Sequence, residues 1–162
     1  MGLDMYLSAE KYLSGYAHRG QGNREHLESV LKTVGFTKSA LSKHSPFATL
    51  SVSVMYWRKA NAIHGWFVST LADGVDECQE IRVPREALER LRDICATIIN
   101  ANESDREAVA SEHLPPTQGF FFGSYEYDEW YWEDLANTHA ELKRILANKS
   151  LADCDFTYRA SW

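Results

Sequence analysis

One dense aromatic stretch, followed by a strongly periodic helix, constrains the fold of this chain more than any other feature. Residues 119–132, GFFFGSYEYDEWYW, hold eight of the twenty aromatic residues in the 162-residue sequence. From Tyr127 onward, apolar side chains recur at the i, i+4, i+8 spacing of an amphipathic helix. The members of this stripe are Tyr127, Tyr131, Leu135, Thr138, Leu142 and Ile145. We expect the stripe to pack against a sheet, with Ser124 as the N-terminal cap of the helix.

Composition and charge indicate one folded domain, residues 1–162, made in a reducing compartment. The chain is 44% hydrophobic and 25% charged, which is ordinary for a globular domain. Its net charge of −6 argues against nonspecific binding to duplex nucleic acid, which depends on Lys and Arg neutralising phosphates. Cys78, Cys95 and Cys154 show no disulfide or zinc spacing. Neither a signal-peptide pattern nor an apolar run of about 18 residues is present, so we expect a cytoplasmic protein that does not enter membranes.

Shorter periodic segments predict an α+β fold, with a small, mostly antiparallel sheet packed against three or more helices. Strands are expected at residues 3–9, 47–57 and 80–83 and around Phe156 and Tyr158. In the first strand, Met5, Leu7 and Ala9 share one face; in the second, Leu50, Val52, Val54 and Tyr56 do so. Helices are expected at residues 26–34, at 58–71 and after Pro84. The helix at 58–71 is predicted to bury Ile63, Trp66, Phe67 and Thr70.

Two polar segments interrupt this pattern. Residues 14–23, SGYAHRGQGN, lack the Gly-Lys-Ser/Thr of a phosphate loop, so a flexible connection is favoured. Residues 100–118 carry a Pro-Pro pair and predict a mobile insertion, within which residues 104–112 could form a short helix.

The first candidate site is the strand-to-helix junction YWRKANAIH, residues 56–64. Arg58, Lys59 and Asn61, together with free backbone N–H groups, could bind phosphate or carboxylate oxygens. Trp57 could stack on a base, and His64 lies at the boundary of this polar face. The alternative is a solvated face on which Lys59 lays its stem along the core.

The second candidate site is the start of the aromatic helix. Asp128 and Asp134 lie about 60° to either side of the apolar stripe, where carboxylates among rings have a raised pKa or a fixed cationic partner. Trp130 lies off the stripe and could stack on a base. The structural alternative is that acidic residues stabilise the helix dipole and that Asp128 or Asp134 pairs with Arg58, Lys59 or Arg159.

The two regions together give one set of candidate ligand-binding residues. They are Trp57, Arg58, Lys59, Asn61, His64, Ser124, Tyr127, Asp128, Trp130 and Arg159. No metal site and no cofactor are expected, because the His and Cys residues lack zinc-binding spacing.

Four blocks of the sequence carry a resemblance to a known family. They are MGLDMYL, YWRKANAIHGWFV, GFFFGSYEYDEWYWEDL and FTYRASW. This combination resembles a family of small proteins encoded by bacteriophages and prophages. The resemblance implies an accessory protein made inside a bacterium, and it brings no defined activity or site. Phage accessory proteins of this size often antagonise host defence, by occluding a protein or capturing a nucleotide messenger.

Three functions follow as hypotheses. The leading one is non-enzymatic capture of a small anionic nucleotide-like ligand, with phosphates at Arg58, Lys59 and Asn61, a base on Trp57 or Trp130, and His64 and Arg159 at the rim. The second is inhibition of a basic host protein by the acidic, aromatic surface of residues 125–133. The third is a nucleotide-modifying enzyme that uses His64 with Asp128 or Glu126. A homo-oligomer with pockets between protomers is compatible with the first hypothesis.

Overall fold

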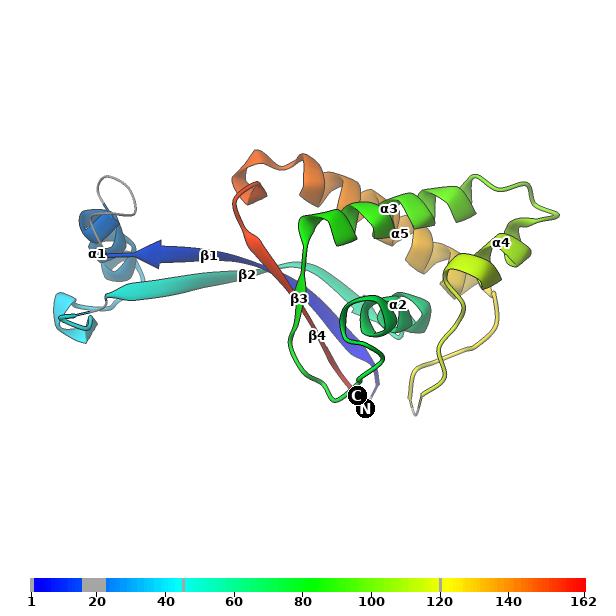
Figure 1. Ribbon diagram of the computed structural model, residues 1–162, viewed down its shortest axis with the longest axis horizontal. Helices are drawn as coiled ribbons and strands as arrows, with labels where there is room; N and C mark the ends of the chain where they lie inside the picture. The colour runs from blue at the N-terminus through cyan, green and yellow to red at the C-terminus, as the bar shows by residue number, and fades with distance from the viewer. Residues whose placement is uncertain (1, 16–22, 45, 120) are drawn as a thin grey trace. The chain divides into compact units, whose positions relative to one another are not determined.

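The computed structural model describes residues 2–15, 23–44, 46–119 and 121–162 (Figure 1). In chain order the elements are β1 (Asp4–Ser14), α1 (Asn23–Thr33), the 3-10 helix η2 (Lys38–Ala40), β2 (Phe47–Arg58), α2 (Asn61–Leu71), β3 (Ile81–Val83), α3 (Arg85–Ile99), α4 (Arg106–His113), α5 (Glu129–Ala147), the 3-10 helix η3 (Lys149–Leu151) and β4 (Asp155–Ser161). Most of the predicted Gly-rich connection at 14–23 lies outside the described residues.

The described strands form one antiparallel sheet in the order β2-β1-β4-β3. β3 pairs with β4 so that Ile81 lies opposite Tyr158 and Val83 opposite Phe156. β1 therefore lies between β2 and β4, the first and last strands of the chain being neighbours (Figure 1). The predicted α+β class is confirmed.

The chain divides into two compact units. The larger unit contains residues 1–9 and 53–162, and the smaller contains residues 10–52. β1 and β2 each contribute residues to both units. That the whole chain forms a single domain stays a prediction.

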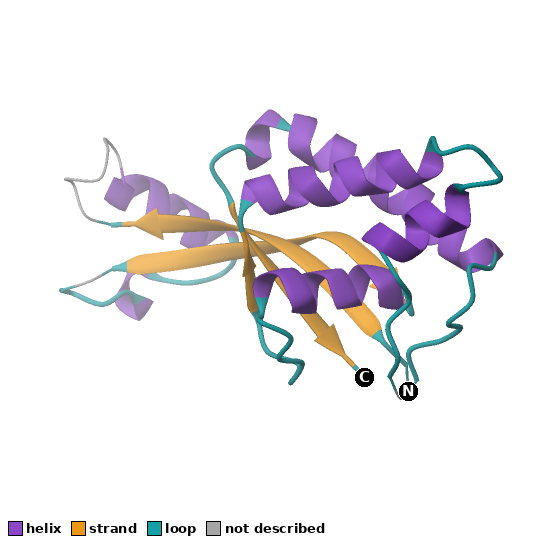
Figure 2. Ribbon diagram, turned by 45° about the vertical axis from the view of Figure 1, so that its right-hand side comes forward, coloured by secondary structure: helices purple, strands orange, loops and turns teal. Residues whose placement is uncertain are grey.

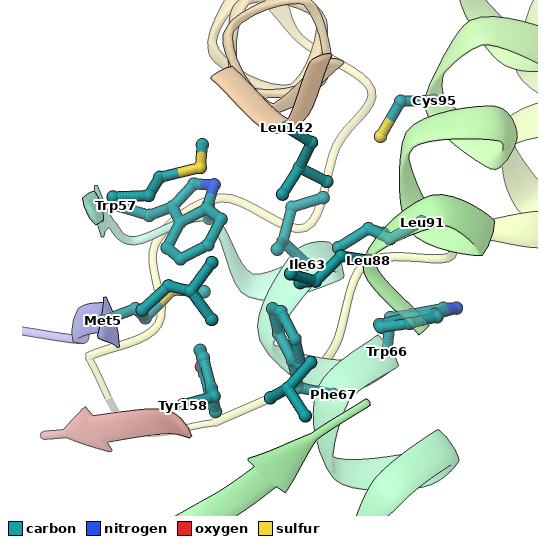
Figure 3. Packing of buried hydrophobic residues seen from close by; sticks show 14 of the residues in the cluster. Met5, Trp57, Ile63, Trp66, Phe67, Leu88, Leu91, Cys95, Leu142 and Tyr158 are labelled. Carbon is teal, nitrogen blue, oxygen red and sulfur yellow. The ribbon is translucent and has the colours of Figure 1, made fainter. Parts of the chain in front are cut away.

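The core of the larger unit lies between one face of the sheet and helices α2, α3 and α5 (Figure 2). Met5, Leu7 and Ala9 of β1 are buried, as their alternation predicts. Figure 3 shows Met5 and Tyr158 from the strands converging with Phe67 of α2. The rings of Phe67 and Tyr158 stack with centroids 4.1 Å apart. The sheet and α2 are thus joined by direct aromatic packing.

The predicted apolar face of β2 is the wrong one. Met55 and Trp57 are buried, whereas Leu50, Val52 and Tyr56 are exposed. Trp57 faces α5, where its indole N–H donates to the Thr138 hydroxyl at 2.8 Å. The first part of β2 is largely exposed on both faces, so alternation of apolar and polar residues there does not report burial.

Helix α2 begins three residues later than predicted and is buried more completely. Lys59 has a φ of 60°, a left-handed conformation that ends β2 before the helix can start. Seven of its eleven residues are buried, which are Asn61, Ala62, Ile63, His64, Trp66, Phe67 and Val68. Thr70, predicted to be buried, is exposed in the last turn.

Helix α5 confirms most of the predicted stripe. Tyr131, Leu135, Thr138, Leu142 and Ile145 are buried. Tyr127 precedes the helix and is half-buried. The cap is Asp128 rather than Ser124, because the chain turns between these residues before the helix begins. The Asp128 Oδ1 accepts from the Tyr131 N–H at 3.0 Å, while the Ser124 hydroxyl accepts from the Glu126 N–H at 3.2 Å.

The polar segment 100–118 contains a packed helix. α4 lies within it, and Ala110 and Leu114 are buried. The Tyr131 hydroxyl donates to the Leu114 carbonyl at 2.8 Å and ties the end of α4 to α5. Mobility of this segment stays a prediction. Among the described residues, none of the helices has the length and apolar character needed to span a membrane.

Leu91→Ala tests the assignment of the core. Leu91 of α3 is 0% exposed, so its truncation should lower the free energy of unfolding by about 2–5 kcal/mol. The matched control is Leu50→Ala, because Leu50 is 48% exposed and should cost about 0.5 kcal/mol or less. Urea unfolding followed by circular dichroism measures both. Equal losses in the two variants would contradict the described core.

Candidate functional site

A cavity of about 510 Å³ opens where the end of β2, the start of α2 and the start of α5 meet. Six of the ten predicted ligand-binding residues line it, namely Arg58, Lys59, Asn61, Ser124, Asp128 and Trp130. The structure thus brings the two candidate regions of the sequence together. Ala62, Ile63, Gly123, Glu126 and Asp134 also line the cavity and were not among the predicted binding residues.

The basic part of the cavity wall consists of Arg58, the last residue of β2, and Lys59, which follows it. Arg58 and Lys59 are both exposed. The Lys59 N–H donates to the Leu3 carbonyl at 2.8 Å, which fixes its backbone against the residue that precedes β1. A Cβ on Gly123, whose φ is 96°, would lie 3.3 Å from the Lys59 Cβ. Glycine at 123 therefore allows both the turn and the close approach of Lys59.

The N-terminus of α2 adds uncapped backbone donors to the same wall. Ala60 precedes the helix and provides no side-chain cap. The N–H groups of Ala62 and Ile63 have no hydrogen-bond partner within the described part of the chain. Free amides at a helix N-terminus carry partial positive charge and favour anions. The amides thus reinforce Arg58 and Lys59.

Asn61 holds the wall together. Its side chain is buried, with its Oδ1 accepting from the Thr117 N–H at 3.0 Å. Its Nδ2 donates to the carbonyls of Phe122 and Ser124, at 3.2 and 2.7 Å. The Asn61 amide was predicted to contact phosphate. Its oxygen and nitrogen are instead hydrogen-bonded to Thr117, Phe122 and Ser124, so the side chain anchors the segment 117–124.

The acidic part of the wall consists of Glu126, Asp128 and Asp134. Burial, and then the charges of Glu133 and Asp128, raise the pKa of Asp134 to about 7. Asp134 has no hydrogen bond or ion pair with any described residue. The position of Asp134 beside the apolar stripe in the sequence predicted such a raised pKa.

The cations and carboxylates of this cavity do not pair with one another. Within the described residues, neither Arg58 nor Lys59 comes within 4.0 Å of a carboxylate oxygen. The ion pairs that would have given Asp128 and Asp134 a purely structural role are therefore not found there. Charges of both signs remain available to a bound molecule.

The aromatic residues divide between the cavity rim and the core. Trp130 lines the cavity and is 73% exposed, so its ring is open to stacking. Trp57 is buried against Thr138 and does not line the cavity. Tyr127 packs edge-on against Tyr131, with ring centroids 4.9 Å apart. Arg159, the last of the predicted set, is exposed on β4 and does not line the cavity either.

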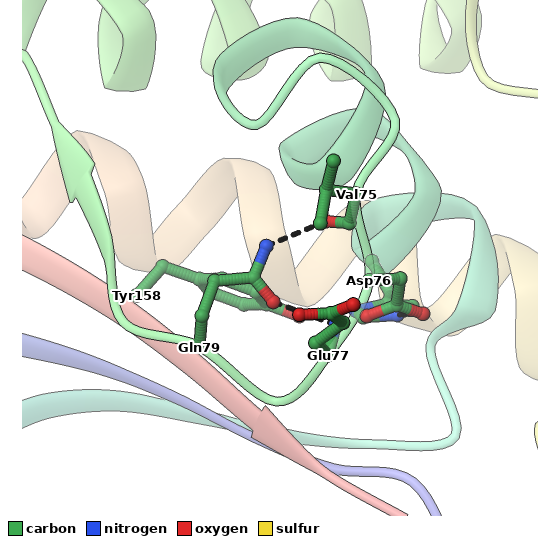
Figure 4. Close-up of polar contacts among 6 residues, drawn as sticks. Val75, Asp76, Glu77, Gln79 and Tyr158 are labelled. Carbon is green, nitrogen blue, oxygen red and sulfur yellow. Dashed lines mark hydrogen bonds and ion pairs between the residues drawn. The ribbon is translucent and has the colours of Figure 1, made fainter.

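His64 belongs to a different polar cluster. It is 1% exposed, its Nδ1 lies 2.7 Å from the Tyr158 hydroxyl, and its Nε2 lies 3.0 Å from the Asp76 Oδ2. Figure 4 shows the loop that carries Asp76, tied internally by Gln79 to the Val75 carbonyl. The enzymatic hypothesis requires His64 to contact Asp128 or Glu126. The imidazole instead contacts Tyr158 and Asp76. Sequence reasoning missed Asp76 because nothing local distinguishes it from the neighbouring acids.

A second cavity of about 440 Å³ lies beside this cluster. His64, Asp76, His113 and Thr117 are among its lining residues. No group of three or more His, Cys, Asp or Glu side chains in the part of the chain that the structure describes is arranged to hold a metal ion.

Comparison with protein-family models, curated proteins and solved structures gave no match to this chain.

Asn61→Ala tests the anchoring role. Loss of three hydrogen bonds, one of them buried and two partly buried, should lower the free energy of unfolding by about 2–4 kcal/mol and increase amide hydrogen exchange in residues 117–124. Asn137→Ala is the matched control, since Asn137 is exposed on α5. Unchanged exchange in 117–124 would show that Asn61 does not hold this segment.

Asp134→Asn tests the raised pKa of the Asp134 carboxyl. In the unfolded chain an Asp ionises near pH 4, whereas in the folded protein Asp134 ionises near pH 7. The folded state thus holds a proton that the unfolded state releases, so the contribution of Asp134 to stability falls as pH rises from about 4 to 7. The variant should match the wild type near pH 3.5 and exceed it by about 1–2 kcal/mol at pH 8, after allowance for partial exposure.

Urea unfolding across this pH range measures the difference, with Asp153→Asn, at an exposed position, as the control. A stability gain at Asp134 that does not change with pH would contradict the raised pKa.

Proposed function

We propose that this protein binds a small, anionic, nucleotide-like ligand in the 510 Å³ cavity and holds it without chemical change. The observation that carries this proposal is the set of charges of both signs lining one cavity without pairing. Cations and carboxylates that line one cavity without pairing can both bind one ligand, provided that this ligand has anionic groups as well as hydrogen-bond donors.

Each part of a nucleotide has a counterpart on the wall. Phosphate oxygens would accept from Arg58, from Lys59 and from the free amides at the start of α2. Hydroxyl or ring N–H groups would donate to the carboxylates of the acidic part. The exposed ring of Trp130 offers a face for a base. A simple anion such as phosphate would leave the acidic part unused.

The cavity volume suits such a ligand. Small-molecule sites measure about 300–1,000 Å³, and the volume found here falls within this range.

Binding is proposed rather than turnover because the described lining residues do not form a nucleophile–base pair. The hydroxyl of Ser124 accepts from the Glu126 N–H, and the buried His64 faces Asp76 and Tyr158. Sequestration also agrees with the resemblance to small phage and prophage proteins. In that setting the ligand would be a nucleotide messenger of a host defence, captured in the bacterial cytoplasm.

Arg58→Gln tests the function by removing charge while keeping most of the side-chain stem. We use ADP and GDP as probes in isothermal titration calorimetry. Loss of a charged hydrogen bond should weaken the affinity for whichever probe binds by about 10-fold or more. Arg159→Gln is the control, because Arg159 is an exposed arginine that does not line the cavity. Equal affinities for wild type and Arg58→Gln would place the phosphates elsewhere.

A second function is favoured by the exposed aromatic residues beside the cavity. Trp130 and Tyr125 are both exposed and stand among Glu126, Glu129 and Glu133. Aromatic side chains in an acidic surround suit docking to a basic protein. Failure of both probes to bind, together with a salt-sensitive complex with a host protein, would favour this function over the first.

A further inference from the structure

Among the three carboxylates of the cavity, Asp134 differs from the other two. Glu126 is exposed to solvent. Asp128 caps α5 through its Oδ1. Asp134 is half-buried and has no hydrogen bond or ion pair with any described residue. A shielded carboxylate without donors has two oxygens available for a ligand.

The position of Asp134 on α5 places it beside the stacking ring. Trp130 and Asp134 are four residues apart on α5, a spacing that makes side chains neighbours on a helix surface. Both line the same cavity. A base lying on the Trp130 ring would therefore present an edge toward the Asp134 carboxylate.

The chemistry of that edge separates the two purines. Guanine carries adjacent N1–H and N2–H donors on its Watson–Crick edge, which match the two oxygens of one carboxylate. Adenine carries an unprotonated N1 at the corresponding place, so a lone pair would face a carboxylate oxygen. A carboxylate placed to accept from the two donors of guanine disfavours adenine strongly, because binding of adenine leaves the shielded carboxylate without a hydrogen-bond donor.

We propose that the nucleotide bound in this cavity is a guanine nucleotide and that Asp134 selects it through the N1–H and N2–H groups of the base. This inference rests on the proposed function, in which Arg58, Lys59 and the α2 amides bind the phosphates. It adds the identity of the base and the residue that reads it.

The test compares GDP, ADP and xanthosine diphosphate in isothermal titration calorimetry at pH 8. Wild type should bind GDP at least about 10-fold more tightly than ADP. Asp134→Asn should lose this preference, because the guanine base loses a hydrogen-bond acceptor and the adenine N1 no longer faces a carboxylate oxygen. The variant should also gain affinity for xanthosine diphosphate, because the Asn amide offers one acceptor for N1–H and one donor for the C2 carbonyl of xanthine.

A pH series adds a readout that a merely structural role would not move. The affinity for GDP should rise more steeply between pH 6 and pH 8 in wild type than in Asp134→Asn, because the ionising terminal phosphate affects both proteins and the ionising Asp134 only the wild type. Asp153→Asn, at an exposed position away from the cavity, should behave as wild type in both experiments.

The outcomes separate the two claims. Wild type that binds none of the three nucleotides overturns the proposed function and this inference with it. Equal binding of GDP and ADP leaves the proposed function standing and overturns the choice of guanine. A preference for GDP that persists in Asp134→Asn overturns the role of Asp134. Loss of the preference together with a gain for xanthosine diphosphate supports it.

Discussion

The buried amide of Asn61 is the constraint on which the candidate site depends. Its three hydrogen bonds join the start of α2 to the segment 117–124, far along the chain. This segment gives Gly123 and Ser124 to the larger cavity and Thr117 to the second one. A single side chain thus positions one wall of each cavity. Because the amide is shielded from water, breaking any of these bonds would leave a buried polar group unsatisfied.

Two of the four non-glycine residues with positive φ in the described part of the chain lie near the candidate site. Lys59 and Phe121 have φ values of 60° and 72°, in the left-handed region that side chains other than glycine rarely adopt. Such residues persist where the surrounding structure holds them, at a free-energy cost of about 1–3 kcal/mol each. Burial of the Asp134 carboxyl, which raises its pKa, adds a further cost to stability in this part of the molecule. Ligand-binding sites often show this compromise.

Sequence reasoning succeeded where one face of an element packs against the core. The α5 stripe and the alternation of Met5, Leu7 and Ala9 both follow from one-sided burial. It failed in β2, where much of the strand is exposed on both faces and alternation carries no information. The proximity of residues 58–61 to residues 124–134 could be predicted from the sequence, since the first segment is basic and the second is acidic. The bonds of Asn61 to 117–124 and of His64 to Asp76 were not, because long-range side-chain partners leave no local pattern.

The position of β4 in the sheet has a kinetic consequence. β1 pairs with β4, so the central strand pair joins residues near opposite ends of the described sequence. Closing so long a loop has an entropic cost, and the contacts between β1 and β4 offset this cost only after the two strands have paired. The antiparallel helices α3 and α5, in contrast, contact each other over a shorter separation and can associate first. We therefore expect the encounter of β1 with β4 to be the slow step of folding.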